Sequence, residues 1–211
     1  MLISVERLLV RLRHVPSRAE ELLEVRARLR REIAAAPGEE EQAIAVAMRA
    51  LKVEISAALT QTASCHTCAT GRRAPRGTFA GGDCCAGVTA DLFDDDEVAA
   101  LAQAGTRPRH LTAPRDEHAG CAFRGSLGCT LEAVDRPMRC VHYTCMILRR
   151  ELRAQGELAP LDVQLAELKR LMARFVELRG TRLDDELLAP LEQAIDANSS
   201  ARAAASSPAP R

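Results

Sequence analysis

The residues of this chain whose type and spacing are best suited to chemistry are eight cysteines, all between positions 65 and 145. They form an early C-x2-C pair, an adjacent C-C pair and a later group spaced C-x7-C-x10-C-x4-C. In chain order they are Cys65, Cys68, Cys84, Cys85, Cys121, Cys129, Cys140 and Cys145. Clustered cysteines in a reducing compartment are more often metal ligands or redox groups than structural disulfides. The clustering therefore predicts one site in the middle of the chain.

The spacing of these cysteines suits a soft metal ion. The two-residue gap between Cys65 and Cys68 lets both thiolates point to one ion. In an extended backbone the adjacent Cys84 and Cys85 point to opposite sides, so they could serve two centres. Eight thiolates match two four-ligand sites or one polynuclear cluster, and soft donors favour zinc or iron, including an iron–sulfur cluster. Spacing alone decides neither the metal nor which cysteines share a centre.

Two other interpretations of the cysteines stay open, a redox disulfide or thiol switch and inert buried thiols. Histidine could also replace a thiol ligand, and His142, between Cys140 and Cys145, is the best placed; the other histidines of this region are His66, His110 and His118. For each of the four, a solvent-exposed histidine that binds no metal is the favoured interpretation. A zinc ion held by four thiolates is a net anion, so nearby cations would offset its charge. The candidates by sequence position, which could equally be solvated loop residues, are Arg72, Arg73, Arg76, Arg136 and Arg139.

Two stretches of this region resemble a known family: DCCAGVTADLFDDDEVAALAQAG at 83–105 and CAFRGSLGCTLEAVDRPMRC at 121–140. They are similar to the YkgJ-type cysteine-cluster family, a zinc- or iron-chelating domain with a CxxCxxCC signature. The family's later motif is C-x-F followed by C-x-[IL]-Y-x-x-R-P-x-x-C. The counterparts here are Cys65, Cys68, Cys84, Cys85, Cys121, Phe123, Cys129, Leu131, Arg136, Pro137 and Cys140.

The resemblance covers about residues 61–148 and implies metal chelation, without implying a settled reaction. A flagellin lysine methylase is similar to the family over its cysteine motif. This chain departs from the family pattern in three places. Fifteen residues separate Cys68 from Cys84, where the family has a very short gap, Glu132 replaces the family's tyrosine, and one extra residue precedes Arg136.

Helices must position the cysteine-rich middle, because residues 61–145 are too poor in apolar side chains to bury a core of their own. The chain is 47% hydrophobic but only 2% aromatic, so its core must be built from Leu, Ala, Val and Ile, which suits helices. We predict a mainly α fold in which a helical bundle flanks an irregular, cysteine-rich, metal-binding middle. The expected parts are a helical N-terminal arm (1–60), the cysteine-cluster region (61–148), C-terminal helices that pack back on the first ones (149–196) and a disordered tail (197–211).

Capping signals set the expected helix boundaries. Amphipathic spacing predicts a helix over 2–14, and Ser17 with Glu20 forms a capping box that opens the next helix. Pro37-Gly38 ends that helix, and the acidic run at 39–41 opens a third one that continues to about 59. Asp94 caps a short helix that Gly105 ends. After the cysteines we expect helices over 146–155, from Pro160 to a stop at Gly180, and over about 187–195, where Pro190 forms a kink or break.

Composition narrows the class of partner and the cellular compartment. The formal net charge is zero and aromatics are few, which argues against a surface that binds nucleic acid. The most apolar helical stretch, 43–59, contains Arg49, Lys52 and Glu54, so we do not expect it to span a membrane. The N-terminus lacks a secretory signal, which indicates a cytoplasmic protein.

For function, the sequence favours a structural or metal-carrying centre whose helices present a surface for a protein partner. The alternative is an iron–sulfur enzyme or electron carrier, acting in protein modification. Substrate, partner and oligomeric state are not indicated by the sequence.

Overall fold

The computed structural model describes residues 16–60, 62, 89–115, 121–125 and 128–205. Helices dominate these ranges, and the strands found in them are the short antiparallel pair β1 (Arg124–Gly125) and β2 (Gly128–Cys129). The prediction of a mainly α fold is therefore confirmed. The expected helix over 2–14 lies outside the described residues, as do Cys65, Cys68, Cys84, Cys85, His66, His118 and the arginines at 72, 73 and 76.

The first two described helices are α2 (Arg18–Ala34) and α3 (Glu39–Thr60). The predicted capping box opens α2: the Glu20 amide donates to the Ser17 hydroxyl at 3.3 Å, and the Ser17 amide donates to the Glu20 carboxylate at 2.7 Å. The expected break at Pro37-Gly38 separates the two helices. Three glutamates in the first turn of α3 match the positive end of its dipole.

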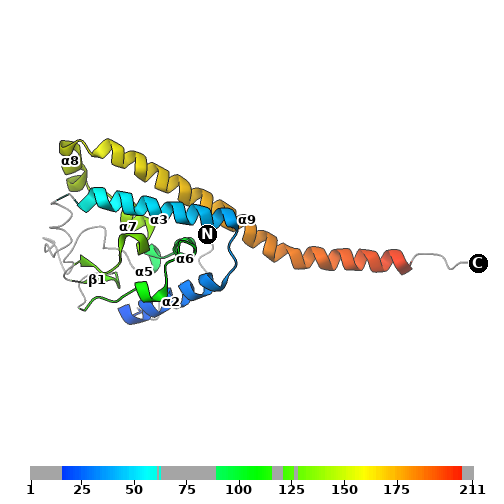
Figure 1. The fold of residues 1–211 in the computed structure, drawn as a ribbon. Helices are drawn as coiled ribbons and strands as arrows, with labels where there is room; N and C mark the ends of the chain where they lie inside the picture. The colour runs from blue at the N-terminus through cyan, green and yellow to red at the C-terminus, as the bar shows by residue number, and fades with distance from the viewer. Residues whose placement is uncertain (1–15, 61, 63–88, 116–120, 126–127, 206–211) are drawn as a thin grey trace, which may run out of the picture.

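A long helix, α9 (Leu158–Ala205), packs antiparallel beside α3 (Figure 1). The preceding helix, α8 (Met146–Gln155), packs on α9 and lies at one end of this pair. Three short helices, α5 (Thr89–Leu92), α6 (Asp95–Gln103) and α7 (Met138–His142), lie between this pair and α2. Two 3₁₀ turns, η2 (Pro108–His110) and η3 (Ala133–Asp135), complete the middle of the chain. The C-terminal helices thus pack back on the first ones, as expected.

The apolar side chains form two buried clusters that meet at α6. Residues of α3, α8 and α9 build the first, with Ile55, Leu152, Leu168 and Phe175 completely or almost completely buried. The second joins α2 to the middle of the chain through Leu22, Val25, Leu29, Leu92, Phe93, Val98, Leu101, Leu111, Phe123 and Leu131. The middle therefore buries more apolar surface than its composition suggests, because it shares a core with α2. Within it, the rings of Phe93 and Phe123 lie 5.2 Å apart.

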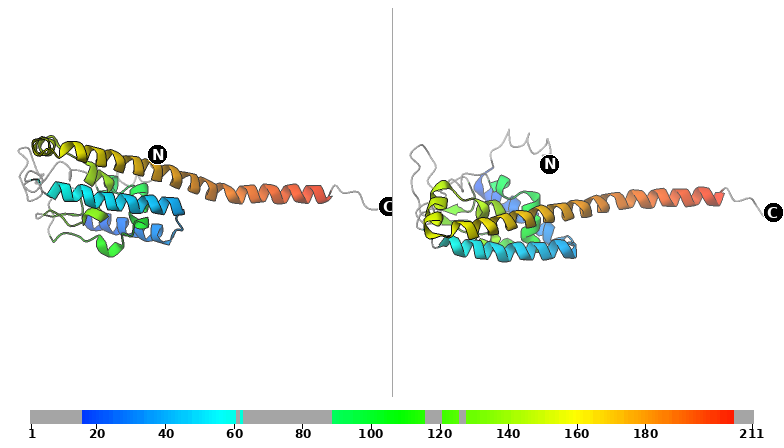
Figure 2. Two further views of the ribbon diagram at one scale, coloured as in Figure 1. Left: turned by 45° about the horizontal axis from the view of Figure 1, so that its top comes forward. Right: turned by 90° about the horizontal axis from the view of Figure 1, so that it is seen from above.

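The predicted stop at Gly180 is wrong, because α9 runs unbroken for 48 residues through both Gly180 and Pro190. An interior glycine costs a helix only about 1 kcal/mol relative to alanine, which tertiary contacts can offset. Here Arg179 pairs with Glu32 and Asp96 at 2.9 Å each, and Arg182 pairs with Glu41 at 2.7 Å. Beyond these contacts the helix extends away from the rest of the molecule, and it includes residues 197–205 of the segment expected to be disordered (Figure 2).

Candidate metal centre

Four of the eight predicted metal ligands fall on described residues, in or next to four different elements. Cys121 lies in a bend before β1, Cys129 ends β2, Cys140 is in α7, and Cys145 is the N-cap of α8. Cys121 is buried, Cys129 is exposed and the other two are half-buried, and no disulfide joins any of these four thiols. The four earlier cysteines lie outside the described residues.

The hairpin of β1 and β2 brings Cys121 and Cys129 within electrostatic range of each other. Burial raises the pKa of the Cys121 thiol, and the neighbouring Cys129 adds to this shift. The peptide N–H of Phe123, which donates to the Cys121 sulfur, and the Thr89 hydroxyl act in the opposite direction, without cancelling it. A metal ion would replace the proton of such a thiol, since a coordinating thiol is deprotonated outright.

Peptide hydrogen bonds to sulfur are the observation that makes these cysteines fit a metal centre. Besides the Phe123 amide at Cys121, the Leu148 amide donates to the sulfur of Cys145 at 3.5 Å. Hydrogen bonds of this kind orient metal-bound thiolates and adjust the potential of iron–sulfur clusters. Zinc or an iron–sulfur cluster is thus compatible with the donor set, in which thiolates supply the bonds and peptide amides support them.

Cys140, another of the predicted ligands, follows the turn at Arg136-Pro137, and two buried side chains hold this turn. Lys52 in α3 donates from Nζ to the carbonyl of Arg136 at 2.9 Å. Glu97 in α6 accepts the peptide N–H of Met138 at 2.7 Å, on the other side of the proline. The Lys52 ammonium and the second Glu97 oxygen are 3.9 Å apart. A buried ion pair therefore fixes both peptide groups that flank Pro137.

The charges of this pair lie in a buried setting, since Lys52 is 3% and Glu97 is 4% exposed. Burial lowers the pKa of Lys52, while Glu97, Asp135 and a thiolate at Cys140 act in the opposite direction and raise it in part. Burial likewise raises the pKa of Glu97, against the opposing effects of Lys52 and the Met138 amide. Lys52 is thus a buried cation whose electrostatic neighbours include a predicted metal ligand.

Sequence reasoning did not single out Lys52 and took it only as a charge that interrupts an apolar helix. Of the arginines considered as cations that offset the metal charge, Arg136 and Arg139 lie on described residues. Arg136 donates from Nε to the Leu131 carbonyl at 3.0 Å, and Arg139 is exposed. The signal that could have identified Lys52 is its position four residues after Met48 and three before Ile55, both buried, which puts it on the buried face of α3.

The described histidines are His142, the last residue of α7, and His110, which contacts Arg107 and Asp135. His110 accepts the Arg107 amide at its Nδ1, at 3.2 Å, and lies 3.5 Å from Asp135, so it stabilises the η2 turn. Asp135 also accepts the Thr106 hydroxyl at 2.7 Å. In the part of the chain that the structure describes, no three His, Cys, Asp or Glu side chains converge as a metal site would require. A complete ligand set therefore needs cysteines outside the described ranges.

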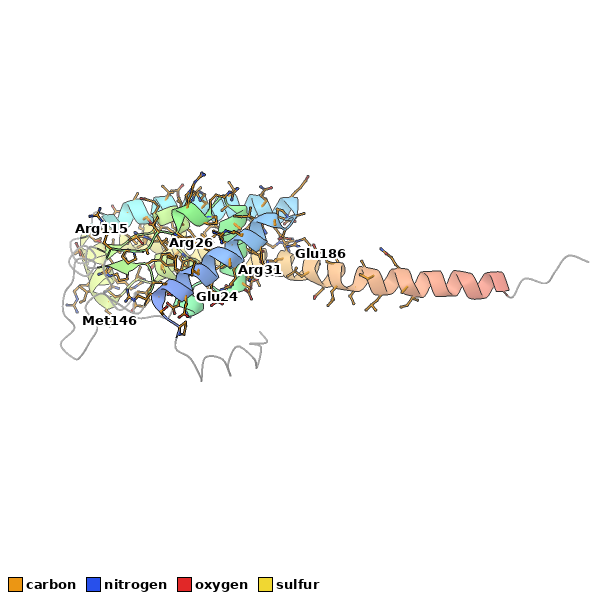
Figure 3. All side chains as sticks on the ribbon, turned by 90° about the horizontal axis from the view of Figure 1, so that it is seen from below. Glu24, Arg26, Arg31, Arg115, Met146 and Glu186 are labelled. Carbon is orange, nitrogen blue, oxygen red and sulfur yellow. The ribbon has the colours of Figure 1, made fainter. Side chains whose placement is uncertain are left out.

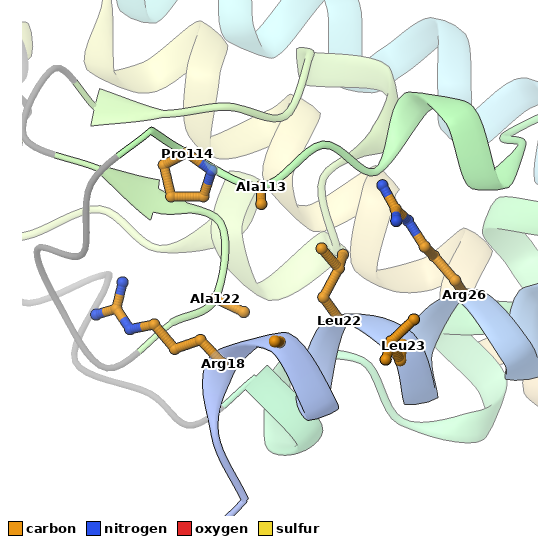
Figure 4. A pocket seen from close by; sticks show the side chains of 8 residues that line it. Arg18, Leu22, Leu23, Arg26, Ala113, Pro114 and Ala122 are labelled. Atoms are coloured by element: carbon orange, nitrogen blue, oxygen red, sulfur yellow. The ribbon is translucent and has the colours of Figure 1, made fainter.

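A groove of about 350 Å³ lies close to the hairpin, between α2 and the segment at 111–115 (Figure 4). Its lining is mostly apolar, and its two arginines already hold the backbone. Arg18 donates to the Arg124 carbonyl at 3.2 Å, and Arg26 donates twice to the Leu111 carbonyl, at 3.0 and 2.6 Å. None of the lining residues is a thiol, an acid or a histidine, so the groove is not a second candidate for the metal centre.

Comparison of the chain with protein-family models, with curated proteins and with solved structures gives no match. The resemblance to the YkgJ-type family therefore remains a prediction that depends on the motif residues. None of the described helices combines the length and apolar character needed to cross a membrane.

Proposed function

We propose that this protein chelates zinc or iron through its clustered cysteines, as separate ions or as an iron–sulfur cluster. The ligands are drawn from Cys65, Cys68, Cys84, Cys85, Cys121, Cys129, Cys140 and Cys145. The centre is structural or metal-carrying, and the helices present a surface for a protein partner. The proposal includes a cytoplasmic location, where thiols stay reduced.

The observation that carries the proposal is the hairpin at Cys121 and Cys129. It brings two of the clustered thiols into electrostatic range and points a peptide N–H at the buried sulfur. An inert buried cysteine needs no such donor, whereas a metal thiolate is stabilised by one. The resemblance to a chelating family adds support, since the same two cysteines are counterparts of its motif.

The surface for a partner is proposed on the part of α9 that extends beyond the body. Leu187, Leu191 and Ile195 follow each other at helical spacing there, and they are 72%, 60% and 64% exposed. Figure 3 shows Glu186 where the helix leaves the body and Met146 at the opposite end of the molecule. An exposed apolar stripe on a projecting helix is typical of a helix that binds another protein.

The experiment for the metal centre is purification with and without oxygen, followed by elemental analysis and a visible spectrum. A colourless protein with bound zinc supports a structural or zinc-carrying centre. A brown, oxygen-sensitive protein favours the alternative function, an iron–sulfur enzyme or electron carrier that acts in protein modification. A metal-free protein whose thiols are oxidised to disulfides would refute both.

The partner surface has its own test. The double variant Leu187→Ser/Leu191→Ser should retain its metal content and lose the partner that is recovered with the wild-type protein. The matched control is Val163→Ser, which removes a similarly exposed apolar side chain near the other end of α9. Equal recovery of the partner with the wild type and the double variant would contradict a binding surface on this part of α9.

A further inference from the structure

We propose that Lys52 and Glu97 are positioning residues of the metal centre, which fix the turn before Cys140 and offset the charge of its metal-bound thiolate. The inference rests on the proposed metal-binding function. It adds two residues that are not cysteines and that belong to different helices, Lys52 in α3 and Glu97 in α6.

The hydrogen bonds of the pair show why it would position Cys140. The Arg136 carbonyl accepts from Lys52 and the Met138 amide donates to Glu97, so the peptides on both sides of Pro137 are fixed. The Cys140 amide in turn donates to the Pro137 carbonyl at 3.0 Å, which connects the cysteine to the same turn. Any shift of the turn would therefore move the start of α7, which carries the Cys140 sulfur.

The two buried charged groups make fewer hydrogen bonds within the described residues than buried charges normally do. A lysine ammonium has three donors, and within the described residues Lys52 uses one hydrogen bond, to Arg136. The Glu97 oxygen that faces Lys52 is buried without a hydrogen-bond partner in the same part of the chain. Buried ion pairs need such additional bonds to compensate for lost hydration. A further anion beside Lys52 would supply the compensation, and a metal bound by several thiolates is one.

Cys140 is the predicted ligand that follows this turn, and as a thiolate it would attract the Lys52 ammonium together with Glu97 and Asp135. Arg49, which lies 3.6 Å from Asp135, acts on Lys52 in the opposite sense. These groups come from α3, α6, η3 and α7, so the charges that act on the ammonium are supplied by four elements. Lys52 therefore has the position expected of a cation that stabilises an anionic thiolate centre.

The test compares variants that separate charge from folding. In Lys52→Met/Glu97→Gln both charges are removed, no buried charge is left alone, and the glutamine oxygen can still accept the Met138 amide. Glu97→Gln alone keeps the hydrogen bond and leaves the Lys52 charge in place. The control is Lys169→Met, which removes an exposed lysine from α9. Each full-length protein is examined for zinc and cobalt affinity by competition with a chelator, for the thiolate-to-cobalt absorption bands, and for metal-free thermal unfolding.

The charge argument predicts opposite signs for the two changes. The double variant should bind zinc about ten- to a hundredfold more weakly than wild type and shift the thiolate-to-cobalt bands. Glu97→Gln should bind at least as tightly as wild type, because the Lys52 charge then acts on the thiolate alone. A merely structural pair would instead weaken metal binding in both variants, in proportion to lost stability, and leave the bands unchanged.

Two results overturn the inference in distinguishable ways. If wild type binds metal and the double variant matches it in affinity and spectrum, the pair has no role in the centre and the proposed function stands. If wild type binds neither zinc nor cobalt, the proposed function and the inference fail together. A double variant that does not fold leaves Glu97→Gln, whose weaker binding would contradict the charge argument.

Discussion

At the scale of single residues, the contacts of Lys52 show how a buried charge can be tied to a site distant in sequence. Its ion-pair partner Glu97 is on another helix, and its hydrogen-bond acceptor, the Arg136 carbonyl, is further still along the chain. Removing one member of a buried pair leaves the other without compensation, which costs more than the pair itself contributes. The stability of the protein should therefore respond more strongly to single than to paired substitution.

The first prediction concerns Lys52→Met, which leaves the Glu97 carboxylate buried alone. We expect the free energy of unfolding to fall by about 3–5 kcal/mol, measured by chemical denaturation in the presence of a chelator. Lys169→Met, at an exposed site, should change it by less than about 0.5 kcal/mol. A loss for Lys52→Met as small as that of the control would mean that water reaches the pair.

A second prediction at this scale concerns the pH dependence given by Glu41. Burial by itself would raise the pKa of Glu41, but hydrogen bonds from Arg182 and Gln103 outweigh it and hold the pKa below its ordinary value of 4.5. A carboxyl group with a lowered pKa stabilises the fold fully above the unfolded value. Its contribution is lost as the pH falls below about 4.5 through the lowered pKa.

The variant that checks this is Arg182→Met, with Arg150→Met as an exposed control. We expect Arg182→Met to lower Tm at neutral pH and to flatten the dependence of Tm on pH below about 4.5, because Glu41 then titrates closer to its unfolded value. If Tm falls with pH below about 4.5 as steeply in Arg182→Met as in the wild type, Arg182 is not what lowers the pKa of Glu41.

At the scale of elements, the helix ends show what the sequence could and could not predict. Local signals were sufficient for α2 and α6, whose caps Ser17 and Asp94 bond to amides three residues away. The stop at Gly180 failed because a glycine ends a helix only where the backbone turns left-handed, and Gly180 does not. The contacts of Arg179 and Arg182 with α2, α3 and α6 keep α9 helical there, and such long-range pairs are not visible in local sequence.

The third prediction compares two glycines of these helices. Gly156 ends α8 at φ +79°, so Gly156→Ala should destabilise the protein by about 1 kcal/mol, because alanine is strained there. Gly180 is inside α9 with nothing within 4 Å of an added Cβ, so Gly180→Ala should stabilise it by about 0.5–1 kcal/mol. Thermal unfolding of both variants measures the difference. A loss of stability for Gly180→Ala would contradict the assignment of α9 as one continuous helix, and a gain for Gly156→Ala would contradict the left-handed end of α8.

The candidate site was predictable in part. Residue type and spacing were enough to nominate the cysteines, since ligand chemistry is local, and the hairpin brings Cys121 and Cys129 into electrostatic range. The proposed positioning residues Lys52 and Glu97 were not predictable, because their helices have the sequence pattern of ordinary amphipathic helices. Their relation to Pro137 depends on how α3, α6 and α7 pack.

At the scale of the whole molecule, α9 belongs both to the core and to the surface. Its first part buries Leu168 and Phe175 completely against α3, whereas Leu187 and Leu191 are exposed on the part that extends beyond the body. The core therefore depends on the first part of the helix, and the second part can serve binding without affecting the fold.

The fourth prediction follows from this division. Leu168→Ala should lower the free energy of unfolding by about 2–5 kcal/mol, because it opens a cavity in the larger core cluster. Leu187→Ala, where the side chain is 72% exposed, should change it by less than about 0.5 kcal/mol. Chemical denaturation of the two variants provides the comparison, and a large loss for Leu187→Ala would mean that the projecting part of α9 is covered in solution.

The central claim is that the clustered cysteines bind metal, and the metal content of Cys129→Ser tests it most directly. Cys129 is exposed at the end of β2, so a thiol without a ligand role could be replaced there at almost no cost. We predict that elemental analysis of protein purified without oxygen finds zinc or iron in the wild type, a clear loss of it in Cys129→Ser, and a lower Tm that matches this loss. Equal metal content and equal Tm in the two proteins, or a wild type free of both metals, would contradict the account.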